Sequence, residues 1–268
     1  MNEQPWQLQI ARRSLKKREK LKLLDHVFFI NTSETALDLG CAQGILSYFL
    51  RRKGGRWIST DLDLKNCRTA DALLEGNCMQ ISSGLLPFRD ESFDTVVCLD
   101  FLEHLDDDDL CLREIRRVLR VNGVLLLAVP RTGRIFFLHH LRKWMGMKLE
   151  FYGHKRDGYR LSDLRSKMSR NGLIPGRRWR FAGFFTEFIE LMLNLAYIKL
   201  FSVEDTSRLR DGHIRPSTSG EFVSKKKTFR LYGIIYPLVW LISRLDRLIF
   251  WQRGYGLLIK ATRSNGNS

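Results

Sequence analysis

LDLGCAQG, residues Leu37 to Gly44, is the stretch of sequence that decides the fold. An apolar strand ends here in a glycine-containing turn, and the next helix opens near Ile45. In a parallel sheet, ligands bind beyond the carboxyl ends of the strands, and glycine lets the backbone approach a ligand where a Cβ would intrude. The stretch therefore predicts a site for a nucleotide-like cofactor at the end of this strand.

Short apolar runs alternate with helical stretches on both sides of this turn. The runs are Ala36 to Leu39, Trp57 to Thr60, Cys78 to Ile81, Thr95 to Leu99 and Val124 to Val129. Strands that alternate with helices of about 10–15 residues are joined by right-handed crossovers and form a mostly parallel sheet. Ser162 is expected to cap a further helix, Pro175-Gly176 to form a turn, and strands to follow near Trp179 to Phe181 and Gly254 to Thr262. This pattern predicts a doubly wound α/β fold.

The second predicted strand ends in Ser59-Thr60-Asp61. In folds of this kind a carboxylate about 20 residues after the glycine turn accepts hydrogen bonds from ribose hydroxyls. Asp61 is therefore the expected ribose ligand, and a solvated aspartate in a turn is the alternative. A dinucleotide cofactor is disfavoured, because the stretch from Gly40 to Gly44 lacks the G-x-G-x-x-G pattern.

Two longer motifs follow in order: LPFRDESFDTVVCLDFLEHL, which ends at Leu105, and REIRRVLRVNGVLLLAVPR, which ends at Arg131. With the glycine turn and Asp61 they resemble the class I S-adenosylmethionine-dependent methyltransferases, in the small-molecule branch similar to ubiquinone-pathway methyltransferases. The resemblance covers roughly Thr35 to Leu173. It implies a Rossmann-like fold with a mostly parallel seven-stranded sheet, helices on both faces, and S-adenosyl-L-methionine as the cofactor.

The resemblance also implies a cofactor site. Asp38, Gly40 and Gly44 would surround the methionine part of the cofactor, Asp61 would hold the ribose, and Leu62 would flank the adenine. The complete set of implied cofactor residues is Asp38, Gly40, Cys41, Gly44, Asp61, Leu62 and Ser82.

The chain departs from the family pattern at two places. Ala42 stands where the family usually has its middle glycine. Ser82 or Ser83 replaces an acidic residue that often precedes the Leu-Pro-Phe motif. Both departures bear on how tightly the cofactor binds rather than on its identity.

Candidate acceptor-site residues follow the fourth predicted strand, in the run that ends with Glu103-His104. His104 can act as a base near neutral pH, with Glu103 beside it and Asp100 facing the substrate. The alternative is that the pair caps the next helix or anchors the loop. His154 and Tyr159 lie in a downstream loop that often covers the acceptor in this family, so His154 is a further catalytic candidate and Tyr159 a substrate contact; a solvated basic loop is the alternative.

The sequence assigns no metal ligands and leaves metal dependence as a hypothesis. Asp100, Glu103 and His104 match in outline an arrangement in which some ubiquinone-pathway and RNA-end methyltransferases hold a divalent cation. Two carboxylates and one imidazole are too few to identify a metal. Neither disulfides nor zinc are expected, because no CxxC pair occurs among Cys41, Cys67, Cys78, Cys98 and Cys111.

The composition divides the chain into three segments. These are a basic helical segment (1–34), the cofactor-binding domain (35–182 plus 253–263) and an apolar helical insertion before the last strand (183–252). In the insertion, Phe184 to Phe201 has a very broad apolar surface at helical period. The apolar run that begins at Leu231 ends near Ile242, short of the roughly 20 residues that span a bilayer, and a polar stretch from Ser202 to Glu221 separates the two.

Charge and aromatic residues suggest where the insertion acts. Basic residues from Lys225 to Arg230 precede its second helix, which carries aromatics as far as Trp251, so an interfacial membrane element is expected. The alternative is that the two helices close over the active site or form a dimer interface. The net charge of +16 points to an anionic partner. No secretory signal pattern opens the chain, so we expect a cytoplasmic protein, peripheral on the inner face of the membrane.

These observations predict an S-adenosylmethionine-dependent methyltransferase for a small acceptor that is hydrophobic or lipid-linked, with O-methylation favoured. An RNA methyltransferase is the first alternative, because the positive charge suits phosphate binding. A non-catalytic cofactor-binding scaffold is the second, because of Ala42 and the missing acidic residue near Ser82. The sequence does not predict an oligomeric state.

Overall fold

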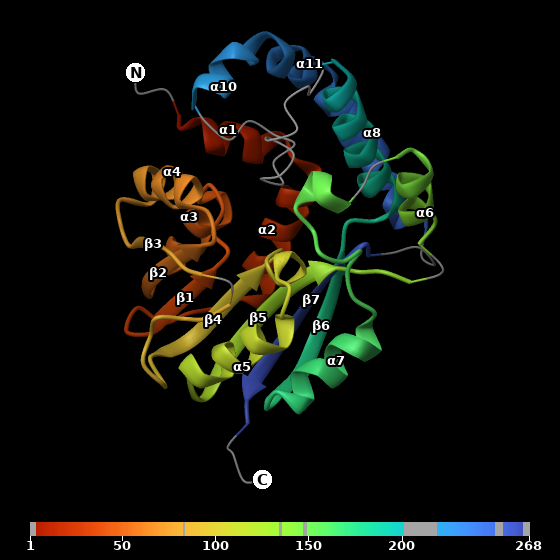
Figure 1. Ribbon diagram of the computed structural model, residues 1–268. Helices are drawn as coiled ribbons and strands as arrows, with labels where there is room; N and C mark the ends of the chain where they lie inside the picture. Colours follow the sequence, from red (N-terminus) through yellow and green to blue (C-terminus); the bar gives the residue numbers. More distant parts are fainter. Residues whose placement is uncertain are drawn as a thin grey trace.

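A seven-stranded sheet forms the centre of the protein (Figure 1). The computed structural model describes residues 4–82, 84–133, 136–146, 149–200, 219–249 and 254–264. The strands are β1 Thr35–Leu39, β2 Arg56–Asp61, β3 Cys78–Gln80, β4 Phe93–Leu99, β5 Leu119–Pro130, β6 Leu173–Phe181 and β7 Gly256–Arg263. Their order is β3-β2-β1-β4-β5-β7-β6. Because β1 to β5 are parallel and only β7 runs antiparallel to its neighbours, the predicted mostly parallel sheet is confirmed.

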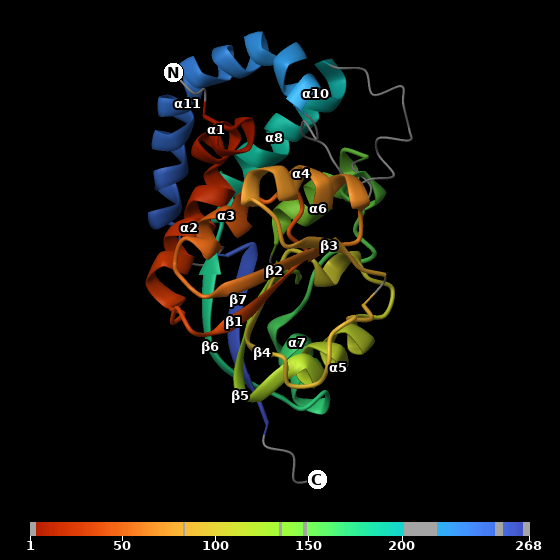
Figure 2. The same ribbon diagram turned by 90° about the vertical axis from the view of Figure 1, so that its left-hand side faces the viewer.

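Helices cover both faces of the sheet, as expected for strands that are apolar on both sides (Figure 2). Val96 and Cys98 of β4 pack on one face against α5 and α7, while Val97 and Leu99 pack on the other against α2 and α3. The helices are α1 Trp6–Arg13, α2 Leu15–Val27, α3 Ile45–Arg51, α4 Leu64–Leu74, α5 Asp108–Val118, α6 Phe137–Trp144, α7 Leu161–Arg170, α8 Phe184–Leu200, α10 Ser219–Ser224 and α11 Lys226–Ser243, with short 3-10 turns η1 Leu102–His104, η2 Leu149–Tyr152 and η3 Arg244–Arg247.

A group of helices lies beyond the carboxyl ends of β1 to β5, where α1, α8, α10 and α11 gather (Figure 1). Ion pairs connect this group to α2 and α6, because the buried Glu187 of α8 contacts both Lys16 of α2 and Arg142 of α6 at 2.8 Å. Glu190 accepts a hydrogen bond from Ser14 at 3.3 Å, so two of the polar residues of α8 face inward. No helix among the described residues is long and apolar enough to cross a membrane.

Two local predictions are wrong, and three others concern residues that the structure does not describe. Pro175 and Gly176 form no turn but lie inside β6, beside an irregularity in its pairing with β7. Proline is tolerated there because β6 is an edge strand, where one side needs no N–H donors. Ser162 does not cap α7, which begins one residue earlier, and its hydroxyl donates to Asp163 instead. Ser83, Trp251 and the polar stretch 202–218 lie outside the described residues.

Candidate active site

The glycine turn after β1 is fixed against the end of β2. The backbone N–H groups of Gly40 and Cys41 both donate to the carbonyl oxygen of Thr60 at 2.8 Å. Gly40 has a φ of +86°, and a Cβ there would lie 2.5 Å from the ring of Phe101. Only glycine satisfies both this backbone conformation and this close approach. Ala42 has a φ of 46°, a left-handed conformation that costs an L-residue about 1–2 kcal/mol.

Asp61 ties the turn to the next helix. Its Oδ2 accepts a hydrogen bond from the backbone N–H of Ala42 at 2.8 Å, and its Oδ1 accepts from Asp63 N and Asn66 Nδ2, each at 3.0 Å. A carboxylate has about four lone-pair sites, so these three bonds leave room for a further donor. Asp61 is therefore fixed at the end of β2 in a position compatible with the predicted ribose contact.

Asp38 is a buried carboxyl beside the same turn, with only 3% of its surface exposed. The hydroxyl of Ser47 in α3 donates to it. Burial raises the pKa of Asp38 to about 6, although hydrogen bonds from Ser47 and Ser59 and the charge of Arg51 act in the opposite direction. A cationic group placed beside Asp38 would favour its ionised form.

The other predicted cofactor residues lie at the same end of the sheet. Gly44 has a φ of +80° and precedes α3, and Leu62 directly follows Asp61. The exposed Ser82 follows Ile81, whose N–H donates to the Asp61 carbonyl at 2.9 Å. The Cys41 side chain is buried among apolar residues of α4, so only the backbone of Cys41 is placed to meet a ligand. The structure thus brings the predicted residues together, and their contacts with the cofactor stay predictions.

Asp100 directly follows β4 and has a φ of 53°. Non-glycine residues in this conformation cluster at functional sites, because the surrounding fold must hold them there. The carboxylate forms an ion pair with Lys20 of α2, and the side chains of Lys20 and Asp100 are 5% and 47% exposed. Partial desolvation would raise the pKa of Asp100, but the charge and hydrogen bond of Lys20 outweigh it and hold that pKa below its usual range. Nothing in the sequence predicts this contact, because the two residues lie 80 positions apart.

A carboxylate–imidazole cluster, formed by Glu103, His104 and His154, lies next to Asp100. Each of the three side chains offers one potential ligand atom, and these atoms lie within 4.8 Å of one another. The two imidazole rings meet edge to face, with centroids 4.8 Å apart. Nδ1 of His104 lies 3.0 Å from the carbonyl oxygen of Gly153. Because a carbonyl can only accept, Nδ1 carries the hydrogen, and the neutral ring carries its lone pair on Nε2.

Burial controls the charge of this cluster. Glu103 is fully buried, and neither of its carboxyl oxygens has a hydrogen-bond partner among the described residues. Burial and the nearby Asp100 raise the pKa of Glu103 to about 8, and burial and His104 lower the pKa of His154 to about 3. Buried polar groups in native folds are nearly always paired, so a buried carboxyl with no partner among the described residues, beside two imidazoles, is a candidate ligand site.

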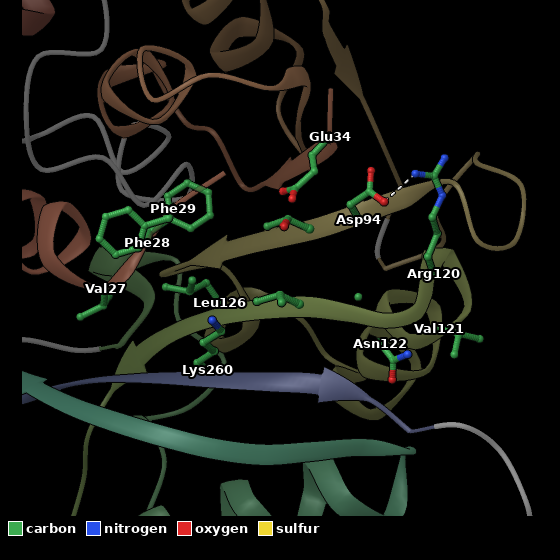
Figure 3. Close-up of a pocket in the computed structure, with 13 residues that line it drawn as sticks. Val27, Phe28, Phe29, Glu34, Asp94, Arg120, Val121, Asn122, Leu126 and Lys260 are labelled. Atoms are coloured by element: carbon green, nitrogen blue, oxygen red, sulfur yellow. Dashed lines mark hydrogen bonds and ion pairs between the residues drawn. The ribbon is translucent and has the colours of Figure 1, made fainter. Parts of the chain in front are cut away.

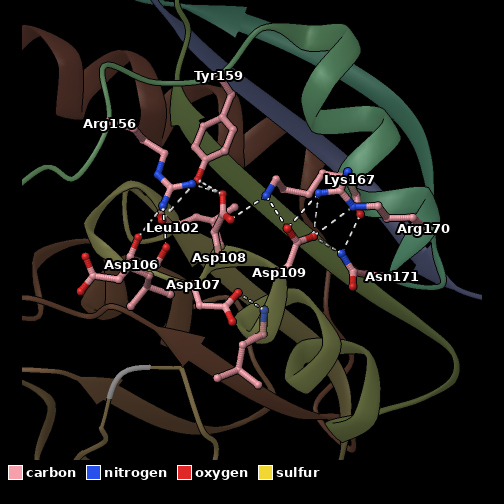
Figure 4. A network of polar contacts seen from close by, with 12 residues as sticks. Leu102, Asp106, Asp107, Asp108, Asp109, Arg156, Tyr159, Lys167, Arg170 and Asn171 are labelled. Carbon is pink, nitrogen blue, oxygen red and sulfur yellow. Dashed lines mark hydrogen bonds and ion pairs between the residues drawn. The ribbon is translucent and has the colours of Figure 1, made fainter.

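A network of ion pairs holds the His154 loop in place (Figure 4). The guanidinium of Arg156 donates to Asp108 at the start of α5 and to the carbonyl oxygen of Leu105 at 2.6 Å. Lys167 of α7 also pairs with Asp108, at 2.6 Å. Nothing in the sequence identifies Arg156 and Asp108 as partners, because 48 positions separate them.

Tyr159 belongs to this network, which corrects its predicted role as a substrate contact. The side chain is 5% exposed and packs within the main core. Its hydroxyl donates to Asp108 at 2.8 Å and lies 3.3 Å from the carbonyl oxygen of Leu102. Tyr159 therefore stabilises η1 from within the core and does not face an acceptor.

The cluster also differs from the outline that the sequence suggests for a divalent cation. Asp100 pairs with Lys20 and does not belong to the cluster. Its place beside Glu103 and His104 is taken by His154. One carboxylate and two imidazoles form a donor set that suits several first-row transition metals. Glu103, His104 and His154 are thus the described residues best placed to hold a cation.

A separate hollow of about 300 Å³ opens at the other end of the sheet (Figure 3). Its lining includes Phe29, Asp94 and Arg120, and the last two form an ion pair at 2.6 Å. Asp94 is the second residue of β4 and Asp100 follows the end of that strand, so at about 3.3 Å per residue the hollow lies roughly 20 Å from the carboxylate–imidazole cluster. The hollow therefore takes no part in the chemistry of the cluster.

Comparisons with known proteins find that part of the chain is similar to methyltransferases. A family model described as a methyltransferase domain matches residues 37–127. The ubiquinone biosynthesis O-methyltransferase of Paracidovorax citrulli is 31% identical over 110 residues, which are 38% of this chain and 46% of that protein. The malonyl-[acyl-carrier protein] O-methyltransferase of Hamiltonella defensa is 30% identical over 123 residues, or 46% of this chain and 47% of that protein. The chain therefore spans about half the length of the curated relatives it matches.

A solved structure extends the likeness in fold to almost the whole chain. A putative methyltransferase of Bacillus halodurans superposes with a TM-score of 0.59 at 19% identity, covering 91% of this chain and 99% of that one. At this identity the likeness concerns the fold alone.

Proposed function

We propose that this chain, a class I S-adenosylmethionine-dependent methyltransferase, transfers a methyl group to an oxygen of a small acceptor that is hydrophobic or lipid-linked. The class and the cofactor, S-adenosyl-L-methionine, follow from the matched methyltransferase domain at residues 37–127. The observation that carries the proposed chemistry is the carboxylate–imidazole cluster, where a carboxyl with no partner in the described part of the chain is buried beside two imidazoles. The cluster follows β4 at the end of the sheet where the cofactor residues also lie.

Methyl transfer from a sulfonium is an in-line displacement. The protein must hold the acceptor atom against the methyl carbon, and such positioning can supply roughly 7–11 kcal/mol in favourable cases. A hydroxyl acceptor must also lose its proton, so a base is needed. In our proposal Nε2 of His104 takes that proton, the acceptor oxygen bonds to the methyl carbon, and the carbon–sulfur bond breaks to leave neutral S-adenosylhomocysteine.

Glu103 and His154 serve that step by holding and shielding the acceptor. His154 is neutral near pH 7, since its pKa is lowered to about 3, and Glu103 is largely protonated, since its pKa is raised to about 8. A protonated carboxyl can donate a hydrogen bond to an acceptor oxygen, which a carboxylate cannot. Oxygen is the acceptor atom that we favour, because both curated relatives described above are O-methyltransferases.

A divalent cation is the second candidate occupant of the cluster. Glu103, His104 and His154 would hold it through one carboxylate oxygen and two imidazole nitrogens. When bound, a cation would lower the pKa of an acceptor hydroxyl. Loss of turnover in EDTA, with recovery on adding a divalent metal, would support the cation, and unchanged turnover would exclude it.

Substitution of His104 tests the base directly. His104→Gln is expected to lower methyl transfer by about 10²- to 10⁴-fold and to leave cofactor binding unchanged, because the ring lies outside the cofactor turn. His140→Gln, at an exposed histidine of α6, is the matched control and should retain full turnover. If the His104 variant transfers methyl groups as fast as the wild type, the proposed mechanism is wrong.

The same assay separates the two alternative functions. Total RNA and a membrane-lipid extract are offered together with methyl-labelled cofactor, and label in RNA would replace our acceptor proposal with RNA methylation. Calorimetry with S-adenosyl-L-methionine addresses the scaffold, because tight binding with product formation excludes a non-catalytic protein. We further propose that residues 35–182 plus 253–263 form the catalytic unit, flanked by the basic segment 1–34 and the insertion 183–252.

A further inference from the structure

The outward side of α11 carries an unbroken apolar stripe. Its aliphatic residues recur at every third or fourth position, and each of them is exposed. They are Leu231 (62%), Ile234 (76%), Leu238 (61%), Leu241 (60%), Leu245 (41%) and Leu248 (71%). The last two extend the stripe through η3. Apolar residues at this spacing normally face the core of a protein, and single exposed ones need no explanation. A continuous exposed stripe instead marks an interaction surface, which we call the α11 face.

The opposite side of α11 is fixed to the N-terminal helices, so the stripe cannot turn inward. The hydroxyl of Tyr232 donates to the carbonyl oxygen of Arg13 at 3.1 Å, and Arg13 donates back to the carbonyl oxygen of Phe229 at 3.2 Å. Arg18 donates to the hydroxyl of Tyr236 at 2.7 Å. The polar groups of α11 are therefore satisfied against α1 and α2, and its aliphatic residues are left outside.

Basic side chains flank the α11 face at both ends. Lys227 and Arg230 are exposed at the start of α11, and Arg247 is exposed in η3. Asp246 is the one acidic residue between positions 226 and 249. It faces inward and accepts hydrogen bonds from Phe185 N at 2.6 Å and Thr186 N at 3.0 Å. The charge that α11 presents to its surroundings is therefore positive.

We infer that the α11 face docks on a bilayer that contains anionic lipids, with the helix lying in the interfacial plane. The aliphatic stripe enters the acyl boundary, and the basic ends meet the lipid phosphates. A second copy of the chain is a poorer partner. In an antiparallel pair Lys227 and Arg230 would meet Arg247 of the other copy, and in a parallel pair like residues would meet, so like charges approach in both cases.

This inference rests on the proposed function, because it explains how a lipid-linked acceptor would reach the site. Figures 1 and 2 show α11 on the outside of the helices beyond the carboxyl ends of the parallel strands. It packs on α8, whose Glu187 pairs with Lys16 of α2. One turn further along α2, Lys20 pairs with Asp100 beside the carboxylate–imidazole cluster. Docking through α11 therefore places the acceptor end of the enzyme next to the membrane.

Vesicle flotation of the full chain tests the inference. The protein is mixed with phosphatidylcholine vesicles with or without phosphatidylglycerol, and the floated fraction is measured. We expect flotation with the anionic vesicles. The double variant I234D/L238D should reduce partitioning at least about 100-fold, because burial of two aliphatic side chains is lost. Phe29→Asp is the matched control, since Phe29 is 80% exposed at the other end of the sheet and should not affect flotation.

Charge neutralisation gives a second, independent readout. K227Q/R230Q should weaken binding to anionic vesicles about 30-fold, and added salt should weaken wild-type binding in the same direction. Both double variants change exposed side chains, so circular dichroism and cofactor binding should remain at wild-type values. These values distinguish lost docking from lost folding.

Three outcomes overturn the inference: the wild type fails to float, I234D/L238D floats like the wild type, or the wild type is a dimer that I234D/L238D dissociates. The flotation readout does not depend on turnover. Flotation without methyl transfer to lipid would refute the proposed function and leave the docking surface standing. Methyl transfer to lipid without flotation would refute the docking surface and leave the proposed function standing.

Discussion

Asp38→Asn is expected to stabilise the fold and to weaken cofactor binding at the same time. The native carboxyl is 3% exposed, and burial raises its pKa from 3.8 to about 6. A shift of this size disfavours the folded state at pH 8 by roughly 3 kcal/mol, because the buried group must ionise. Asparagine resembles the protonated acid and removes this penalty.

The sign of the effect fixes its pH dependence. An acid whose pKa is higher in the folded state destabilises the fold only where the unfolded chain has lost the proton. The penalty is therefore absent below about pH 4, grows between about pH 4 and 6, and is complete above that range. Urea unfolding should show Asp38→Asn to be more stable than the wild type at pH 8, and the difference should vanish near pH 4.

Cofactor affinity should change in the opposite direction. In our proposal an ionised Asp38 attracts the ammonium of the methionine part, and a hydrogen bond to a charged group contributes about 1.5–3 kcal/mol, or roughly 10- to 100-fold in affinity. Wild-type affinity should fall about tenfold between pH 7 and pH 5 as Asp38 takes up its proton, whereas the affinity of the variant should stay flat. Calorimetric titration with S-adenosyl-L-methionine measures both.

The matched control is Asp25→Asn, because Asp25 has a side chain that is 65% exposed and lies away from the turn. It should change neither stability at pH 8 nor affinity by a comparable amount. A less stable Asp38→Asn protein at pH 8, or wild-type affinity that is the same at pH 5 and pH 7, would refute the reasoning.

Three further substitutions test the turn and the loop network. Ala42→Gly should raise the free energy of unfolding in urea by about 1 kcal/mol, since glycine removes the left-handed strain at that position; an unchanged or lower value would contradict this. Gly40→Ala should lower that free energy by about 2–5 kcal/mol, because the new Cβ is strained and meets the ring of Phe101, and a loss within 0.5 kcal/mol of zero would contradict it. Arg156→Gln, which breaks the contact with Asp108, should lower kcat at least about tenfold with cofactor Kd unchanged, whereas a weakened Kd with normal kcat would assign Arg156 to the cofactor side.

The parallel half of the sheet could be predicted because its strands are apolar on both faces. Val96, Val97, Cys98 and Leu99 form one continuous apolar run, and each pair of alternate residues is buried on its own face. The sequence predicts a turn at Pro175 because proline is rare inside a strand. An edge strand accepts a proline, but only the assembled sheet determines which strand lies at its edge.

The candidate site could be predicted only in part. Glu103 and His104 are neighbours in the sequence, so their proximity needs no tertiary information. The approach of His154 depends on Arg156 reaching Asp108 across 48 positions, and the orientation of Asp100 depends on Lys20 across 80 positions. Such pairs form when helices and loops dock, which no local pattern encodes.

The most direct test of the account is to incubate the purified chain with methyl-labelled S-adenosyl-L-methionine, a membrane-lipid extract and total RNA, and to separate the products. We predict label in the lipid fraction, and its loss in the His104→Gln variant. Label in RNA alone, or no transferred label at all, would contradict the proposed function.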